Sequence, residues 1–196
     1  IIGEYEMSFD IALHFGTLLA IIVYFFKDFW KMFINGITKG TKTQEGKMLW
    51  FIVVATIPAA IFGLLFEDMI DGVLRGNYIL IACTLAIMGI IINYCDKLNK
   101  QSRSFKDMTF KDALIIGCAQ VCALIPGFSR SGTTISAARV LKLERSDAAK
   151  FSFYLSAPVV LGAVVIKVLK GEMIDLITYD LKIFILGVLI SFISGL

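Results

Sequence analysis

The sequence predicts an all-α integral membrane protein, a polytopic helical bundle in one transmembrane domain that includes a re-entrant helix-loop-helix hairpin. Hydrophobic residues make up 58% of the 196 residues, against about 45–50% in an ordinary soluble domain. Charged residues make up only 18%, mean hydropathy is +0.81, and the apolar residues form long runs. The net charge of +3 is too small to indicate nucleic-acid binding. The expected partner is therefore the bilayer.

The apolar runs predict the membrane spans. A helix needs about 20 apolar residues to cross a hydrocarbon core of about 30 Å. Runs that meet or approach this length predict spans at residues 9–26, 48–66, 78–94, 151–169 and 183–196. Pro58 and Pro158 lie inside two of them, which membrane helices tolerate because neighbouring groups satisfy the freed backbone.

The segment 110–143 predicts a hairpin that enters and leaves the membrane on one side. Its apolar part, residues 113–125, is too short to span and ends at Pro126-Gly127. A polar stretch follows, and a second short arm resumes at residues 133–143. Two short apolar arms around a polar tip are typical of a re-entrant segment.

The loop charges support the same topology. Cytoplasmic loops of membrane proteins are enriched in Lys and Arg. The loops 27–47, 96–112 and 139–150 are basic, whereas the loops 67–75 and 167–182 are not. The three basic loops share one side of the membrane only if the hairpin returns to that side, so the charges predict a cytoplasmic base for it.

The polar tip of the hairpin predicts a phosphate site. Arg130 lies at membrane depth, where an ionisable residue indicates function by default. Gly127 and Gly132 permit close approach of a ligand, and a helix is expected to open at Thr133 with Ser131 as its N-cap. A helix N-terminus and a guanidinium both favour phosphate oxygens. The alternative is a polar turn whose arginine reaches the interface.

The hydroxyl groups around Arg130 complete the predicted site. They belong to Ser129, Ser131, Thr133 and Thr134.

Other polar or sulfur-containing residues lie in the apolar runs, and the sequence predicts no definite functional role for any of them. Gln120 lies near the tip and is expected either to hydrogen-bond within the hairpin or to face the site. His14, the only histidine, favours helix packing over catalysis. Cys118 and Cys122 share a helix face, but no His, Asp or Glu lies close in sequence to complete a metal site. No metal ligand is predicted in this chain.

The residues around the tip resemble those of a known family. Residues 117–135 read Gly-Cys-Ala-Gln-Val-Cys-Ala-Leu-Ile-Pro-Gly-Phe-Ser-Arg-Ser-Gly-Thr-Thr-Ile. This run closely resembles the second signature of the bacterial undecaprenyl-diphosphate phosphatases, the bacitracin-resistance family. Residues 151–158 continue the resemblance, and residues 9–20 resemble the helix that follows the family's first signature.

The resemblance implies a hydrolase of the bacterial plasma membrane. The implied reaction converts undecaprenyl diphosphate to undecaprenyl phosphate and phosphate, which recycles the lipid carrier of cell-wall synthesis. It implies six spanning helices and two re-entrant hairpins in an inverted repeat, and dependence on a divalent cation (Mg²⁺ or Ca²⁺). A homodimer is left open. A faint similarity between residues 9–23 and 151–166 agrees with an inverted repeat.

The resemblance also assigns residues. It places Ser129, Arg130 and Thr134 in the site, where they are expected to act in catalysis, with Arg130 binding the diphosphate. From the residue types alone, the groups expected to bind the substrate phosphate are Gly127, Ser131, Gly132 and Thr133.

One part of the family pattern is absent. The first signature, a glutamate pair followed by Pro-x-Ser-Ser-x-Gly-His, does not occur in the chain, and Glu4 and Glu6 do not match that pair. The cation ligands are therefore expected outside this chain, as is the family's last helix. We expect a fragment that is inactive alone.

Two other functions fit the residues. An isoprenoid-phosphate flippase without hydrolase activity would also use inverted repeats and an anion site at membrane depth. A purely structural subunit would make Arg130 dispensable.

Overall fold

The computed structural model describes residues 2–66, 69, 77–98, 102–169 and 181–196. These residues fall into two compact units, residues 1–31 with 156–196, and residues 32–155. Over the described ranges every regular element is a helix, with one isolated bridge between Arg103 and Leu143. The all-α prediction is confirmed.

Three helices are long and apolar enough to cross a membrane. They are Gln44–Leu65, Tyr78–Lys97 and Arg145–Ile166, and the shorter apolar helices are Leu13–Tyr24 and Leu181–Gly195. Together they overlap all of the predicted spans, and the chain is an all-α membrane protein. Where each helix enters and leaves the bilayer stays a prediction. The two loops that are not basic, 67–75 and 167–182, lie mostly outside the described residues.

The first unit contains α1 (Ile2–Tyr24), the C-terminal part of α8 (Arg145–Leu169) and α10 (Leu181–Gly195). Helices α1 and α10 pack closely because small residues lie between them. A Cβ on Gly16 would lie 2.5 Å from the Val188 carbonyl oxygen, and the Ser191 hydroxyl donates to the Leu13 carbonyl at 2.6 Å. Small residues that let helix backbones approach are typical of membrane bundles.

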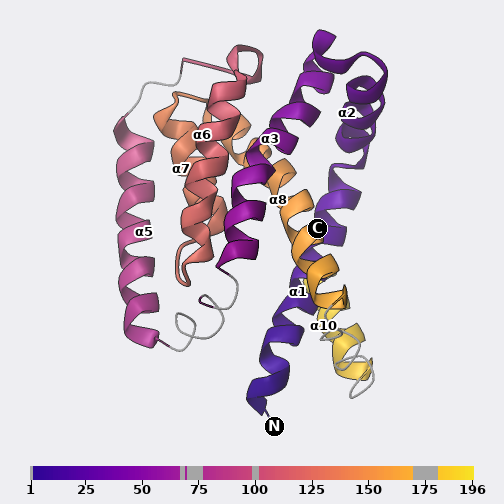
Figure 1. Ribbon diagram of the computed structural model, residues 1–196, viewed down its shortest axis with the longest axis vertical. Helices are drawn as coiled ribbons and strands as arrows, with labels where there is room; N and C mark the ends of the chain where they lie inside the picture. The colour runs from indigo at the N-terminus through magenta and orange to yellow at the C-terminus, as the bar shows by residue number, and fades with distance from the viewer. Residues whose placement is uncertain (1, 67–68, 70–76, 99–101, 170–180) are drawn as a thin grey trace. The chain divides into compact units, whose positions relative to one another are not determined.

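The second unit is built around the predicted hairpin. Its helices are α3 (Gln44–Leu65), α5 (Tyr78–Leu98), α6 (Phe110–Val121), α7 (Arg130–Val140) and the first part of α8. Helices α6 and α7 pack side by side, α3 packs against α6, and α5 packs against α7 (Figure 1). The hairpin therefore lies between two apolar helices.

Close packing fixes α6 against α3. The backbone of Ala55 lies where a Cβ on Gly117 would be, and the rings of Phe51 and Phe110 meet edge to face at 4.8 Å. Capping boxes set the helix starts in this region, since the Thr109 side chain and Asp112 close the first turn of α6 reciprocally.

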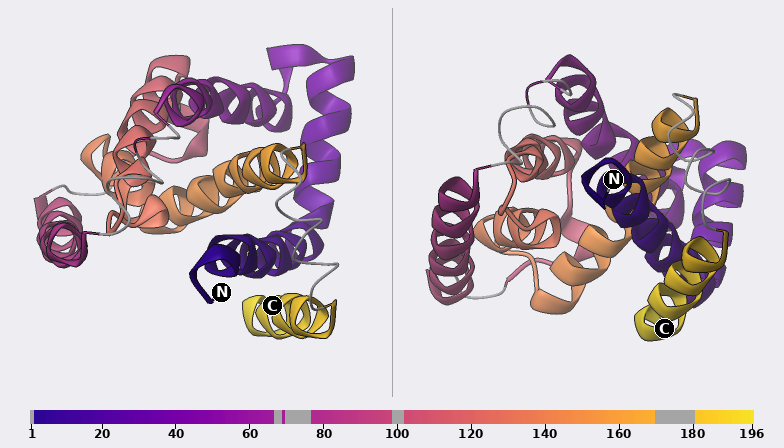
Figure 2. Two further views of the ribbon diagram at one scale, coloured as in Figure 1. Left: turned by 60° about the horizontal axis from the view of Figure 1, so that its bottom comes forward. Right: turned by 90° about the horizontal axis from the view of Figure 1, so that it is seen from below.

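Helix α2 (Phe26–Thr38) and the short 3-10 turn η1 (Gly40–Lys42) join α1 to α3. The Trp50 indole donates to the Gly36 carbonyl at 3.3 Å, which fixes the C-terminal part of α2 on the first turns of α3. Figure 2 shows this part of α2 running across the end of α3.

Candidate functional site

The tip of the hairpin is a tight turn made by the Pro-Gly pair. Helix α6 ends in the 3-10 turn η4 (Cys122–Leu124), and the Phe128 amide then donates to the Ile125 carbonyl at 3.1 Å. Gly127 has φ +93°, a conformation that favours glycine because it has no Cβ. The chain therefore reverses direction within a few residues and points α7 back along α6.

Helix α7 begins earlier than the sequence predicted. Ser129 is the N-cap, and its hydroxyl oxygen accepts from the Gly132 amide at 3.1 Å. The predicted N-cap, Ser131, lies in the first turn instead, and the predicted start at Thr133 is wrong. Ser129 is the N-cap, and not Ser131, because its backbone is extended (φ −72°, ψ 121°). This conformation lets its side chain reach the free amides of the first turn.

Arg130 occupies the first residue of α7. Its side chain is half-buried, and in the described part of the chain no hydrogen bond or ion pair to the guanidinium is present. Ser131 is exposed, and its hydroxyl lies 3.3 Å from that of Ser129. A free cation, a hydroxyl pair and a helix N-terminus therefore lie together at the tip, and each of these groups favours an anion.

The two threonines of the predicted site are turned into the protein. Thr133 is 8% exposed and Thr134 is 2% exposed. The Thr133 hydroxyl donates to backbone carbonyls of its own helix. The Thr134 hydroxyl lies 3.0 Å from the Arg130 carbonyl and 2.7 Å from the Ser152 hydroxyl of α8. Their roles toward a phosphate stay predictions.

Helix α5 supports the tip through residues that sequence reasoning missed. The Thr84 hydroxyl donates toward the Pro126 carbonyl at 2.7 Å, and Thr84 also occupies the space where a Cβ on Gly127 would be. Ile92 lies 3.0 Å from the ideal Cβ position of Gly132. The only signal in the sequence was that Thr84 is a hydroxyl residue within a long apolar run.

Two buried polar groups of the hairpin have no partner among the described residues. They are the side-chain nitrogen of Gln120 and the hydroxyl of Ser136. Gln120 is 2% exposed, so its side chain lies inside the packed hairpin. No hydrogen bond of its amide nitrogen supports either predicted role.

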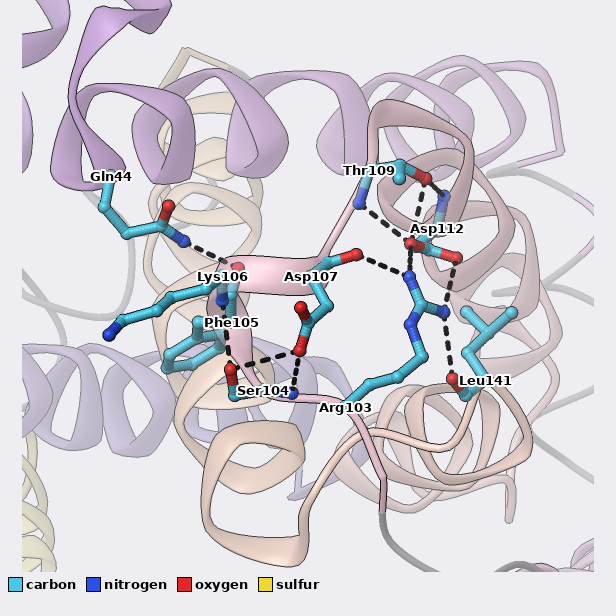
Figure 3. Close-up of polar contacts among 9 residues, drawn as sticks. All are labelled: Gln44, Arg103, Ser104, Phe105, Lys106, Asp107, Thr109, Asp112 and Leu141. Carbon is cyan, nitrogen blue, oxygen red and sulfur yellow. Dashed lines mark hydrogen bonds and ion pairs between the residues drawn. The ribbon is translucent and has the colours of Figure 1, made fainter.

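The base of the hairpin is held by one arginine (Figure 3). Arg103 donates to both oxygens of Asp112, at 3.3 Å and 2.6 Å. It also donates to the Leu141 carbonyl at the end of α7, at 3.0 Å, and to the Asp107 carbonyl, at 2.6 Å. Arg103 therefore joins the start of α6 to the end of α7.

The titration of this pair follows from its contacts. Burial raises the pKa of Asp112, but hydrogen bonds from Arg103 and Thr109 outweigh it, so the net pKa of Asp112 is lowered. The hydrogen bond to Asp112 raises the pKa of Arg103. Both groups are therefore charged at neutral pH.

A second ionic cluster joins α5, α7 and α8. Arg139 is 2% exposed and donates to the Leu143 carbonyl at 2.7 Å and to Asp96 at 3.2 Å. Asp96 also accepts two hydrogen bonds from Arg145, at 2.8 Å and 2.6 Å. Because Arg139 is buried, loss of Asp96 would leave an uncompensated charge. These contacts hold the end of α7 to the end of α5 and the start of α8.

The described residues do not fit a divalent cation. They contain no group of three or more His, Cys, Asp or Glu side chains that could hold a metal ion. At the tip, the nearest donors are serine and threonine hydroxyls beside the positive Arg130, whereas Mg²⁺ and Ca²⁺ prefer carboxylate and carbonyl oxygens.

Fold and site together define an all-α membrane protein with a hairpin of two short helices, α6 and α7. Ser129, Arg130 and Ser131 lie at the tip of this hairpin. The family model described as "Bacitracin resistance protein BacA" matches residues 2–196. The chain belongs to this family.

Three similar curated proteins share one name, undecaprenyl-diphosphatase. The chain is 44% identical over 192 residues to a protein of Caldicellulosiruptor bescii named undecaprenyl-diphosphatase, covering 98% of this chain and 71% of that protein. It is 47% identical over 167 residues to a protein of that name from Elusimicrobium minutum, covering 84% of this chain and 62% of the relative. It is 38% identical over 190 residues to a protein of the same name from Moorella thermoacetica, covering 96% of this chain and 70% of that protein.

Proposed function

We propose that this chain supplies the phosphate-binding part of an enzyme that hydrolyses undecaprenyl diphosphate in the bacterial plasma membrane. Membership of the BacA family and the names of the relatives support this activity. The observation on which the proposal rests is that the Arg130 guanidinium, at the N-terminus of α7, has no hydrogen bond or ion pair with any described residue. At the membrane depth that the sequence predicts for it, such an arginine is costly unless a ligand uses it.

In the proposed reaction, a water oxygen attacks the terminal phosphorus of the diphosphate. The bond from that phosphorus to the bridging oxygen breaks, and the bridging oxygen leaves with undecaprenyl phosphate. One proton of the water stays on the released phosphate and the other passes to solvent. Arg130 stabilises the charge that develops on the transferring phosphoryl group. The first turn of α7 adds backbone amides and the positive end of its dipole.

The hydroxyl groups have separate tasks in this proposal. Ser131 is exposed at the tip and donates to a phosphate oxygen. Ser129 is already engaged with the Gly132 amide, so it orients the turn and also lines the site. Thr134 fixes α7 on Ser152. Gly127 and Gly132 let the turn lie close to α5, because Thr84 and Ile92 occupy the space that a Cβ would need.

The experiment measures phosphate release from undecaprenyl diphosphate by the chain together with any residues that flank it in the cell. Arg130→Ala should lower the rate about 10²-fold or more while leaving folding intact, because the described residues make no hydrogen bond or ion pair to the guanidinium that would be lost. Lys150→Ala, which removes an exposed lysine, is the matched control and should keep full activity.

A requirement for Mg²⁺ or Ca²⁺ stays a prediction, and so does a homodimer. Chelation followed by return of each ion tests the first, and light scattering of the purified protein tests the second. If well-folded protein releases no phosphate under any of these conditions, the phosphatase proposal fails. Translocation of a labelled isoprenoid phosphate across vesicles would then be measured.

A further inference from the structure

Helix α2 has one face that is apolar and exposed. Its side chains recur along one stripe of the helix, as a period of 3.6 residues requires. They are Phe26, Trp30, Phe33, Ile34 and Ile37, with exposed fractions of 56%, 58%, 52%, 42% and 64%. The stripe is therefore continuous over the length of α2.

The inward face of α2 is already occupied. Met32 is 4% exposed, and the backbone at Gly36 lies against the Leu49 side chain and accepts from the Trp50 indole. Since α3 takes this face, the stripe residues of the C-terminal part of α2, Phe33, Ile34 and Ile37, lie on a different face of the helix.

Two lysines flank the stripe on its other side. Lys27 and Lys31 are one turn apart and exposed, and neither has a hydrogen bond or ion pair within the described ranges. They belong to the segment 27–47, which has five lysines against two acidic residues. Going around α2, the order is therefore a packed face, an apolar stripe and a cationic edge.

We infer that α2 lies in the membrane–water interface and binds anionic phospholipid headgroups through Lys27 and Lys31. The stripe, which includes Trp30, enters the boundary between headgroups and acyl chains, and the lysines extend to the phosphates. Amphipathic helices with aromatic residues on one face and lysines on the other bind membranes in this way. This inference does not depend on the proposed enzymatic function.

The position of α2 along the chain supports this orientation. Helix α3, a candidate membrane span, begins at Gln44, soon after α2 ends at Thr38. The C-terminal part of α2 runs across the end of α3 (Figure 2). If α3 crosses the bilayer, this part of α2 lies along the bilayer surface.

The first experiment locates Trp30. The full protein is placed in nanodiscs whose lipids have bromine at a shallow or a deep position of the acyl chain. The chain has two tryptophans, so the quenching due to Trp30 is obtained as the difference between the unchanged protein and Trp30→Phe. We expect shallow bromines to quench Trp30 more than deep ones. No quenching by either lipid would overturn the inference and would favour a second copy of the chain on the stripe.

The second experiment tests the lysines. Native mass spectrometry compares binding of phosphatidylglycerol with binding of phosphatidylcholine. Removing both charges in Lys27→Gln/Lys31→Gln should lower the preference for phosphatidylglycerol about fivefold for each lysine. The matched control is Lys39→Gln/Lys42→Gln, which makes the same change of charge outside α2. An equal loss in both variants would overturn the assignment to α2.

Discussion

The hydroxyl oxygen of Thr84 lies 2.7 Å from the carbonyl oxygen of Pro126, so a residue in the middle of α5 holds the tip of the hairpin. The same hydroxyl lies 2.9 Å from the carbonyl oxygens of Leu80 and Ile81 in its own helix. A hydroxyl has one hydrogen to donate, and the Pro126 carbonyl is the nearest acceptor. Since Gly127 follows at once, the direction of the turn depends on Thr84.

Replacing Thr84 by valine should therefore lower activity. Thr84→Val keeps the shape of the side chain but leaves the Pro126 carbonyl without its donor, which costs about 1–3 kcal/mol when the group is buried. Part of this cost is expected to appear as a misplaced Arg130, with kcat/KM lowered about tenfold. Phosphate release at varied substrate concentration measures the change.

Thr84→Ser is the control, because it restores the hydroxyl with one methyl group less. Activity close to that of the unchanged protein is expected. If Thr84→Ser and Thr84→Val lose activity equally while both remain folded, the hydrogen bond to Pro126 does not position the site.

Much of the fold was predictable from local pattern. Long apolar runs predicted the helices, and Pro126-Gly127 predicted the turn, because each follows from the properties of a few neighbouring residues. The start of α7 was not predictable in the same way. Ser129 and Ser131 are both good N-caps by residue type, and only the backbone after the turn decides between them. The support from Thr84 is a tertiary contact, for which the sequence contains no distinguishing signal.

The hydroxyl pair of Thr134 and Ser152 separates a catalytic role of Thr134 from a supporting one. The two oxygens lie 2.7 Å apart in the interior. If Thr134 acts by fixing α7 on α8, Ser152→Ala and Thr134→Val should each lower the thermal stability and reduce activity by a similar factor, about fivefold.

Both variants are compared by phosphate release and by thermal unfolding in the same detergent. A much larger loss of kcat in Thr134→Val than in Ser152→Ala, at equal stability, would contradict the supporting role. Direct contact of Thr134 with substrate would then be favoured.

The ion pair of Arg103 and Asp112 predicts how the hairpin base responds to acid. The net pKa of Asp112 is lowered, because hydrogen bonds from Arg103 and Thr109 outweigh the effect of burial. Its contribution to stability is therefore fully present above the unfolded pKa of about 3.9. That contribution is lost as the pH falls through the lower pKa of the folded state.

Amide hydrogen exchange in the first turn of α6 should consequently be constant, after correction for intrinsic rates, between pH 8 and about pH 5. It should increase only at more acidic pH. Asp112→Asn should show increased exchange already at neutral pH. Loss of protection between pH 7 and pH 5 in the unchanged protein would contradict this assignment.

The charge pattern predicted a side of the membrane but not these pairings. The positive-inside rule counts Arg103, Arg139 and Arg145 equally as loop charges. In the structure, Arg139 is buried and shares Asp96 with Arg145, whereas Arg103 binds Asp112. Which arginine meets which aspartate depends on how helix ends converge, and loop composition contains no information about that.

The packing of α1 on α10 predicts opposite effects for two glycine substitutions. A Cβ on Gly16 would lie 2.5 Å from the Val188 carbonyl oxygen and 2.8 Å from the Ser191 Cβ, so backbone would have to move. Gly16→Ala should therefore cost about 1–3 kcal/mol. Gly162, within α8, has no atom within 4 Å of the ideal Cβ position, and alanine is the better helix former by about 0.5–1 kcal/mol.

Thermal unfolding in one detergent should show a lower Tm for Gly16→Ala and an equal or higher Tm for Gly162→Ala. Because both changes add one methyl group to a helix interior, a lower Tm in both variants would mean that packing of α1 on α10 is not what distinguishes Gly16.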